Sequence, residues 1–218
     1  MLSIIDATMG FNGTKLFEAV NLTVPGGEVL LLSAPSGVGK STLLHWICGT
    51  SPPELNATGR VSLDGEDLTH LPAEQRGVGI IFQDALLFPH LTVWENLAFG
   101  MKSGGMKAGG GRGERRRLAL EALEENGLGG LGDRDPLSLS GGQKARVSLL
   151  RCLMASPRAL LLDEPFSGLD DEARNDFAHL VLDRVLENSL PTIIVSHDPR
   201  DEAWATLPVV KLKATVTF

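Results

Sequence analysis

The sequence predicts an α/β fold in which helices cover both faces of a parallel sheet. Short, fully apolar runs at residues 159–162 and 192–195 each adjoin a helical pattern, as strands buried on both faces do. Ahead of them, the first thirty or so residues alternate like strands of an antiparallel sheet. We therefore expect a core of α/β type that carries a small antiparallel β lobe.

The N-terminal half is punctuated by turn-forming residues. Asn12-Gly13 and Pro25-Gly26-Gly27 are turn signals that separate the first three runs. The strands expected in this half are residues 2–7, 16–24, 28–33, 60–63 and 78–82. An apolar stretch over residues 41–48 predicts a buried helix.

Between about residues 84 and 156 the pattern becomes helical. A glycine-dense, basic stretch at residues 104–113 carries Lys107 and Arg112, and we expect it to be a solvated loop that leads into a helix at residues 114–126. No internal repeat is visible. The sequence therefore predicts a single domain, residues 1–218, with this helical lobe inserted into it.

Composition excludes some classes of function. The chain of 218 residues has a net charge of −7, whereas general nucleic-acid binding needs a basic face. We find neither a signal peptide nor an apolar run of the roughly 18 residues that span a bilayer. Cys48 and Cys152 lie singly, so we expect free thiols. We expect a soluble, cytoplasmic protein that binds no nucleic acid.

A glycine-rich loop follows the third expected strand and precedes a helix. Residues 34–42 read Ala-Pro-Ser-Gly-Val-Gly-Lys-Ser-Thr, a pattern whose backbone amides bind nucleotide phosphates. In this pattern Lys40 reaches the β- and γ-phosphates, and the Ser41 hydroxyl ligates Mg²⁺. The residues expected to bind nucleotide here are Ser36, Gly37, Val38, Gly39, Lys40, Ser41 and Thr42.

Ala34 departs from this pattern because it stands where the first glycine usually lies. If the backbone there required a positive φ, alanine would cost about 1 kcal/mol.

Two acidic residues follow the apolar run at residues 159–162. Asp163 ends that run, so its carboxylate should emerge at the carboxyl end of a strand and hold Mg²⁺ through water. Glu164 is the candidate that polarises the attacking water. A simple helix cap is the alternative, but it does not explain the Pro-Phe-Ser-Gly-Leu-Asp run at residues 165–170.

A third motif, Leu-Ser-Gly-Gly-Gln at residues 139–143, lies between the loop and the acidic pair. With them it resembles the signature of the ABC ATPases, which hydrolyse ATP as head-to-tail dimers. The resemblance implies a P-loop NTPase core of the ABC type. The serine before two glycines is predicted to be the N-cap of a helix, and an ordinary capped helix without a phosphate partner is the alternative. The signature residues implied to close on the γ-phosphate bound by a second copy are Ser140, Gly141, Gly142 and Gln143.

Three further residues acquire roles through the resemblance alone. Gln83 matches the glutamine that senses the metal and the attacking water and links to the permease. His197 matches the switch histidine that contacts the γ-phosphate. Phe11 is the candidate for stacking on adenine, because the chain has no tyrosine. An ordinary surface or core residue is the alternative for each.

The stretch from Phe82 to Leu97 resembles importer ATPases of the thiamine, sulfate, iron and polyamine group. Short thiamine-type subunits fit best, since the chain ends soon after Lys213, where most of that group continue into a regulatory domain. The segment after His197 also lacks the helix–strand ending that is usual in the group. An apolar stretch of this kind fits a groove for a permease helix, although a lobe core would look similar.

The resemblance therefore implies an ATPase that uses ATP and Mg²⁺ to power transport of a small solute, and specifically import. Its implied partners are a second copy of itself, integral-membrane permease subunits and a solute-binding protein. It would lie on the inner face of the cell membrane through the permease. An exporter or lipoprotein-release ATPase and a soluble non-transport ABC protein are the alternatives.

Overall fold

The computed structural model describes residues 1–17, 19–35, 37–101 and 111–213. The chain divides into two compact units. The first comprises Met1–Ile80, Arg158–Pro165 and the residues from Leu182 onward, and the second comprises Ile81–Pro157 and Phe166–Val181. Each unit is described by itself.

A parallel sheet forms the centre of the first unit, with strand order β10-β4-β9-β8-β7. Its strands are β4 (Val29–Ser33), β7 (Val78–Ile81), β8 (Ala159–Asp163), β9 (Thr192–Ser196) and β10 (Val210–Lys211). The pairs β10–β4, β4–β9 and β9–β8 are parallel. Every residue of β8 and β9 is buried, which confirms the two apolar strands predicted from the sequence.

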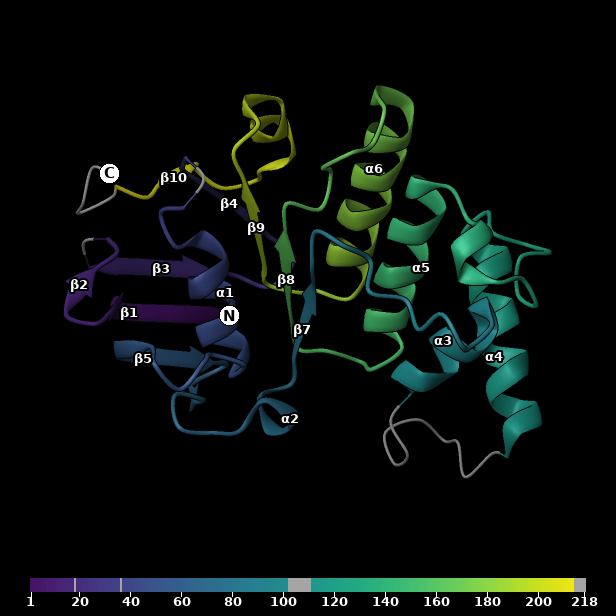
Figure 1. Ribbon diagram of the computed structural model, residues 1–218, viewed down its shortest axis with the longest axis horizontal. Helices are drawn as coiled ribbons and strands as arrows, with labels where there is room; N and C mark the ends of the chain where they lie inside the picture. The colour runs from purple at the N-terminus through teal and green to yellow at the C-terminus, as the bar shows by residue number, and fades with distance from the viewer. Residues whose placement is uncertain (18, 36, 102–110, 214–218) are drawn as a thin grey trace. The chain divides into compact units, whose positions relative to one another are not determined.

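An antiparallel sheet forms the second layer of this unit. Its strands are β1 (Leu2–Phe11), β2 (Thr14–Lys15), β3 (Val20–Val24), β5 (Asn56–Leu63) and β6 (Glu66–Asp67). β1 pairs with β2, β3 and β5, and Figure 1 shows β1, β3 and β5 side by side. Asn12 and Gly13 both have positive φ, as a two-residue hairpin turn requires, so the predicted turn is confirmed.

The expectation of one strand over residues 16–24 is wrong. Thr14–Lys15 pair with β1, and the Leu16 N–H still donates to the Met9 carbonyl. Phe17 forms an isolated bridge, and the strand β3 begins at Val20. Between these points Phe17 is fully buried in the core, and both Leu16 and Phe17 lie against the backbone of Gly39. Leu16 and Phe17 therefore pack against the glycine-rich loop and do not continue a regular strand.

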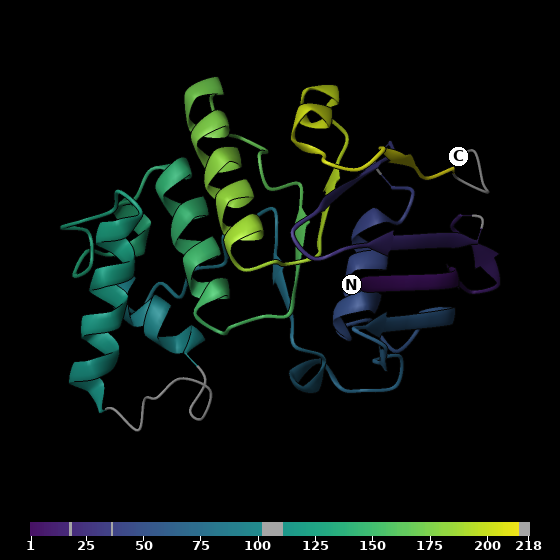
Figure 2. The same cartoon turned by 180° about the vertical axis from the view of Figure 1, so that it is seen from behind.

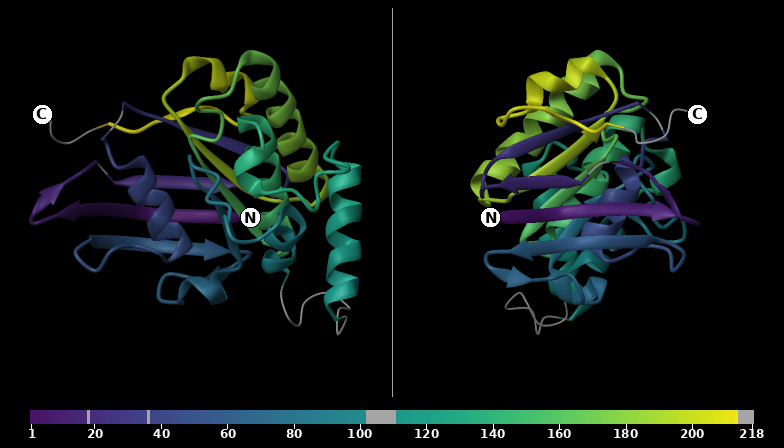
Figure 3. Two further views of the ribbon diagram at one scale, coloured as in Figure 1. Left: turned by 45° about the vertical axis from the view of Figure 1, so that its right-hand side comes forward. Right: turned by 90° about the vertical axis from the view of Figure 1, so that its left-hand side faces the viewer.

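Helix α1 (Lys40–Cys48) shares one hydrophobic core with both sheets of the first unit. Leu43, Leu44 and Ile47 are fully buried. The same cluster contains side chains of β1 and β4, and Figure 3 shows α1 beside the strands of the antiparallel sheet. This packing fixes the helix that follows the glycine-rich loop.

The end of the described chain differs from expectation. A 3₁₀ helix, η2 (Pro199–Trp204), follows β9, and β10 pairs in parallel with β4. The prediction that the segment after His197 lacks a helix–strand ending is therefore wrong. The two-residue strand and the 3₁₀ turn are too short to give a periodic signal in the sequence.

The second unit is helical and has its own core. Its elements include α3 (Val93–Gly100), α4 (Arg112–Glu125), η1 (Pro136–Ser138), α5 (Gly141–Leu153) and the part of α6 (Asp171–Glu187) up to Val181. Val93, Leu97, Ala119, Leu123 and Val147 are buried together between α3, α4 and α5. Figure 2 shows these three helices packed side by side in teal and green. Helix α4 confirms the helix predicted at residues 114–126 and begins two residues earlier.

A buried arginine in the short helix α2 (Ala73–Arg76) holds the C-terminus of α1. The Arg76 guanidinium donates to the carbonyls of Trp46 (2.7 Å) and Ile47 (3.0 Å), and also to those of Leu71 and Thr69. These bonds satisfy carbonyls that a helix end otherwise leaves unpaired. Gly49 is required beside it, because a Cβ there would lie 2.6 Å from Arg76 Nε.

We predict that Arg76→Ala lowers the free energy of unfolding by about 3 kcal/mol, because it removes the hydrogen bonds to the buried carbonyls of Trp46 and Ile47 and two further bonds to the segment that leads into α2. Urea unfolding followed by circular dichroism measures this. Arg60→Ala is the control, since the Arg60 side chain is 66% exposed and makes only a surface ion pair with Asp67. Equal midpoints for the two variants would contradict the role given to Arg76.

Candidate nucleotide-binding site

The glycine-rich loop joins β4 to α1 at the carboxyl end of the parallel sheet. Gly37 and Gly39 have φ of 83° and 103°, a region that glycine adopts without strain. A Cβ on Gly39 would also lie 2.9 Å from Leu16 Cδ1. Ala34 is not among the residues with positive φ, so the cost considered above does not arise. Ser36 lies outside the described residues.

Lys40 is buried in this loop and is only 6% exposed. Its Nζ donates to the carbonyl oxygens of Ala34 (2.6 Å) and Pro35 (3.2 Å) and lies 3.7 Å from Glu164 Oε1. The amine therefore points back over the loop, and its contact with phosphates stays a prediction. Of its predicted neighbours, Val38 is buried and Thr42 is half-buried.

Ser41 lies in the first turn of α1 and Asp163 ends β8, and the Ser41 hydroxyl lies close enough to the Asp163 carboxylate to lower its pKa. Burial raises the pKa of Asp163, and the nearby charge of Glu164 adds to this, while Ser41, His45 and Lys40 lower it. Asp163 Oδ1 is buried and accepts no hydrogen bond within the part of the chain described. A cation would relieve this desolvated, unpaired oxygen.

These oxygens fit Mg²⁺ that arrives with a nucleotide. Mg²⁺ usually takes one or two protein groups and completes its octahedral shell with water and substrate phosphates. Across residues 1–213, apart from the segments outside the description, no three His, Cys, Asp or Glu side chains are grouped to hold a metal. Ser41 and Asp163 are therefore the protein groups that would hold it in the first unit.

Glu164 and His197 meet at the same edge of the sheet. His197 Nδ1 lies 2.8 Å from Glu164 Oε1, and because an ionised carboxylate only accepts, Nδ1 carries the hydrogen. The Glu164 backbone N–H donates to the Val195 carbonyl, and Glu164 has a φ of 48°. A left-handed backbone at a non-glycine residue costs roughly 1–2 kcal/mol and is common at functional sites.

Ser196 and Asp201, which were not predicted from the sequence, support the Glu164–His197 pair. Ser196 Oγ donates to Asp201 Oδ2 at 2.5 Å and accepts from the Asp198 backbone N–H at 3.0 Å. Ser196 and Asp201 are both buried. A polar residue at the end of a buried strand, followed five residues later by a buried acid, gives no signal that marks it in the sequence.

The signature motif opens α5 in the second unit. The Ser140 side chain accepts from the Gln143 backbone N–H, and the Gln143 side chain accepts from the Ser140 backbone N–H. This reciprocal pair is a capping box and confirms the predicted N-cap. Gly141 is exposed and Gly142 half-buried, and a hollow of about 280 Å³ reaches from Ser140 to Asp170. Unpaired amides at such a helix end favour anions.

Gln83 also belongs to the second unit, where it is exposed and donates to Ser167 Oγ at 3.3 Å. The turn after it is held by Arg151 of α5, which donates to the carbonyls of Ala85 (3.0 Å) and Leu86 (2.8 Å). The Arg151 guanidinium also lies over the ring of Phe88, 5.3 Å from its centroid. The segment that follows Gln83 is thus fixed to the signature helix.

Phe11 is the last residue of β1 and is half-buried next to the hairpin turn. Its stacking on adenine stays a prediction, as do the roles of the other predicted site residues toward ATP and Mg²⁺.

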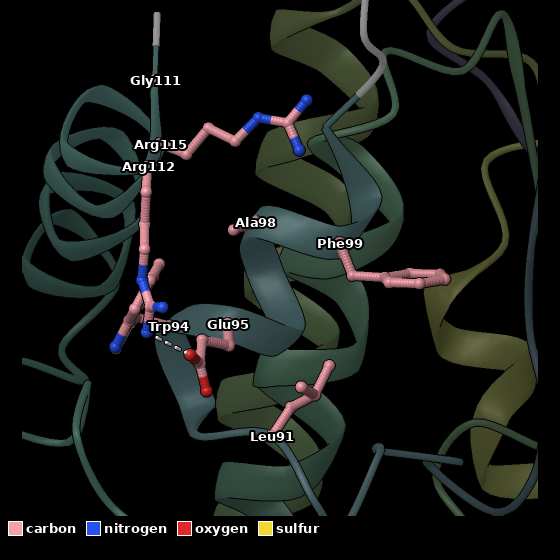
Figure 4. A pocket seen from close by; sticks show the side chains of 8 residues that line it. All are labelled: Leu91, Trp94, Glu95, Ala98, Phe99, Gly111, Arg112 and Arg115. Atoms are coloured by element: carbon pink, nitrogen blue, oxygen red, sulfur yellow. Dashed lines mark hydrogen bonds and ion pairs between the residues drawn. The ribbon is translucent and has the colours of Figure 1, made fainter.

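A second hollow of the helical unit lies over α3 and α4 and has a volume of about 530 Å³ (Figure 4). Its floor is apolar, and its rim is basic because Arg112 and Arg115 lie there. Arg112 pairs with Glu95 at 2.8 Å and its guanidinium lies 5.3 Å from the Trp94 ring centroid. Nearby Phe99 is 66% exposed.

A family model described as "ABC transporter" matches residues 17–167. The chain belongs to this family. It is an ATP-binding ATPase subunit of the ABC type, which confirms the class of enzyme and the fold that the sequence predicts.

Among known ABC proteins, the uncharacterized ABC transporter ATP-binding protein YnjD of Escherichia coli (strain K12) is 42% identical over 92% of this chain and 90% of its own length. The Fe(3+) ions import ATP-binding protein FbpC of Brucella abortus (strain 2308) is 40% identical over 92% of this chain. The chain spans 54% of that relative's length.

The ABC fold is also seen in a solved structure. The ATP-binding cassette MJ0796, in a dimeric post-hydrolysis state bound to ADP and Pi, superposes with a TM-score of 0.81 and 29% identity. The match covers 98% of this chain and 94% of that one.

We predict that Asp163→Asn raises the melting temperature of the nucleotide-free protein at pH 7. The folded state raises the pKa of Asp163, so wild-type stability falls as pH rises from below the ordinary aspartate pKa through the raised value. An amide removes this penalty, and the difference should vanish at acidic pH. Calorimetry from pH 3 to 8 measures it, with Asp133→Asn at an exposed position as control. A lower melting temperature at pH 7 would contradict the prediction.

Proposed function

We propose that this ABC ATPase powers the import of a small solute through a separate permease. The observation that carries the catalytic part is the gathering of Lys40, Ser41, Asp163, Glu164 and His197 at one edge of the parallel sheet. Ligands in such sheets bind at the carboxyl ends of the strands. The import part is supported by FbpC, which is an importer ATPase.

In the proposed reaction the phosphates of ATP bind over the glycine-rich loop, and Lys40 moves its hydrogen bonds from loop carbonyls to phosphate oxygens. Ser41 and Asp163 would hold Mg²⁺, which would supply positive charge against the phosphates. Glu164 accepts a proton from the attacking water, and His197 holds the Glu164 carboxylate in place. Gln83 is proposed to contact the metal and the water.

The signature of a second copy is proposed to complete the site. The open hollow at Ser140 and Gly142 and the helix N-terminus beneath it suit the γ-phosphate of ATP bound to another copy. The dimer of MJ0796 supports this arrangement. Closure of two copies would exclude water and strengthen the electrostatic contacts, and release of phosphate would reopen them.

The permease is proposed to bind the segment between Gln83 and Phe99. Leu86 is 56% exposed and Phe99 is 66% exposed, so this segment offers apolar surface to a partner. In the described parts of the chain no helix is long and apolar enough to cross a membrane. We place the protein on the inner face of the cell membrane through this permease, with a solute-binding protein in the same complex.

We predict that Glu164→Gln binds ATP with near-normal affinity but lowers kcat by roughly 100- to 10,000-fold, since it cannot accept a proton. It should also accumulate as an ATP-bound dimer, visible by size-exclusion chromatography with light scattering. Glu187→Gln, at an exposed position of α6, is the control. Normal turnover in Glu164→Gln would refute the assignment of the base, and a monomer that hydrolyses ATP at full rate would refute the dimer.

We predict that the tagged chain, expressed at native level, co-purifies with integral-membrane subunits in mild detergent. Mass spectrometry would identify the permease and any solute carried by the binding component. The double variant Leu86→Ser, Phe99→Ser should reduce recovery of the membrane subunits. Leu186→Ser is the matched control, because Leu186 is also exposed but lies in the first unit. Recovery of ribosomal or DNA-bound partners alone would overturn the transport proposal.

A further inference from the structure

Ser196 directly precedes His197, and its hydroxyl is hydrogen-bonded to two residues that follow His197. Its hydroxyl donates to Asp201 Oδ2 at 2.5 Å and accepts from the backbone N–H of Asp198 at 3.0 Å. The Asp201 backbone N–H in turn donates to the Asp198 carbonyl. We call Ser196, Asp198 and Asp201 the Ser196 cluster. It closes a tight loop of backbone around His197.

The cluster is buried although the side chain that it flanks is exposed. Ser196 is 1% and Asp201 2% exposed, whereas the His197 side chain is 57% exposed. An exposed imidazole on a loop samples several rotamers unless its backbone and its ring contacts are fixed. Here the backbone is fixed from below by the Ser196 cluster, and the ring is fixed by Glu164.

The Ser196 hydroxyl also lies close to Glu164. Its Oγ is 3.4 Å from Glu164 Oε2 and 2.5 Å from Asp201 Oδ2, and it has one hydrogen to donate. The shorter distance assigns that hydrogen to Asp201. Glu164 therefore keeps its hydrogen bond with His197 (2.8 Å) and its longer ion pair with Lys40 (3.7 Å).

We infer that Ser196 and Asp201 are positioning residues for ATP hydrolysis. They fix the backbone of His197 so that Nδ1–H donates to Glu164, and Asp201 draws the Ser196 hydrogen away from the Glu164 carboxylate. Their described hydrogen bonds join them to each other, to Asp198 and to Glu164, so we expect them to act on turnover more than on affinity for ATP. This inference rests on the proposed function, in which Glu164 and His197 act in hydrolysis.

Steady-state kinetics of the full chain tests the inference. Ser196→Ala and Asp201→Asn should each lower kcat on the order of 10- to 100-fold, with KM for ATP within about 2-fold, as expected when a catalytic group is displaced. Ser196→Thr should restore turnover because it keeps the hydroxyl. Ser148→Ala, which removes a buried hydroxyl in α5, is the matched control and should keep wild-type kcat.

A second readout does not depend on hydrolysis. Nitrogen-15 NMR of the ring distinguishes the two histidine tautomers, and His197→Gln assigns the signal. The wild type should show hydrogen on Nδ1 of His197, and Ser196→Ala should shift the population toward Nε2. Ser196→Ala and Asp201→Asn alter the two partners of the same hydrogen bond, so the test needs only one of them to fold.

Wild-type kcat together with an unchanged tautomer in Ser196→Ala would overturn the inference. So would an equal loss of kcat in Ser148→Ala. A tautomer shift in Ser196→Ala together with normal turnover in Glu164→Gln would locate the failure in the proposed catalytic role of Glu164, while the positioning of His197 stands.

Discussion

The burial of one lysine amine constrains the nucleotide site more than any other contact. A buried amine must be paired, and Lys40 achieves this with two loop carbonyls and the nearby Glu164 carboxylate. The carbonyls can face the amine only if the loop turns back on itself, which requires the positive φ at Gly37 and Gly39. The close approach of Leu16 and Phe17 to Gly39 then ties the antiparallel sheet to the same loop.

The parallel register places the remaining groups around that lysine. Ser33 lies opposite Ser196, and Asp163 lies opposite Val195, so β4, β8 and β9 end at the same level. The residues that leave these strands are therefore neighbours without any insertion or bulge. One amine and two carboxylates share this small volume. Among the residues that the structure describes, Asp163 Oδ1 is left without a hydrogen bond there, so it can accept a cation.

Most of the confirmed predictions came from local sequence patterns. The apolar run ending at Asp163, the helix after the glycine-rich loop and the cap at Ser140 each depend on a few adjacent residues, and all three are confirmed. The predictions that failed concern residues whose structural partners are distant in the sequence. The strand β3 begins later than expected while Phe17 packs in the core, and β10 is recognisable only by its pairing with β4. Arg76 likewise acquires its role from the carbonyls of Trp46 and Ile47, in a chain segment that sequence periodicity does not connect to it.

The hydrogen bonds that Arg151 makes to residues 85 and 86 are to main-chain oxygens. Every amino acid supplies a carbonyl, so residues 85 and 86 can change identity without loosening their attachment to the signature helix. Evolution could thus reshape the surface offered to different membrane partners while preserving the mechanical connection behind it. Side chains that can change, attached through carbonyls that do not, would allow the same ATPase fold to be used for many transported solutes.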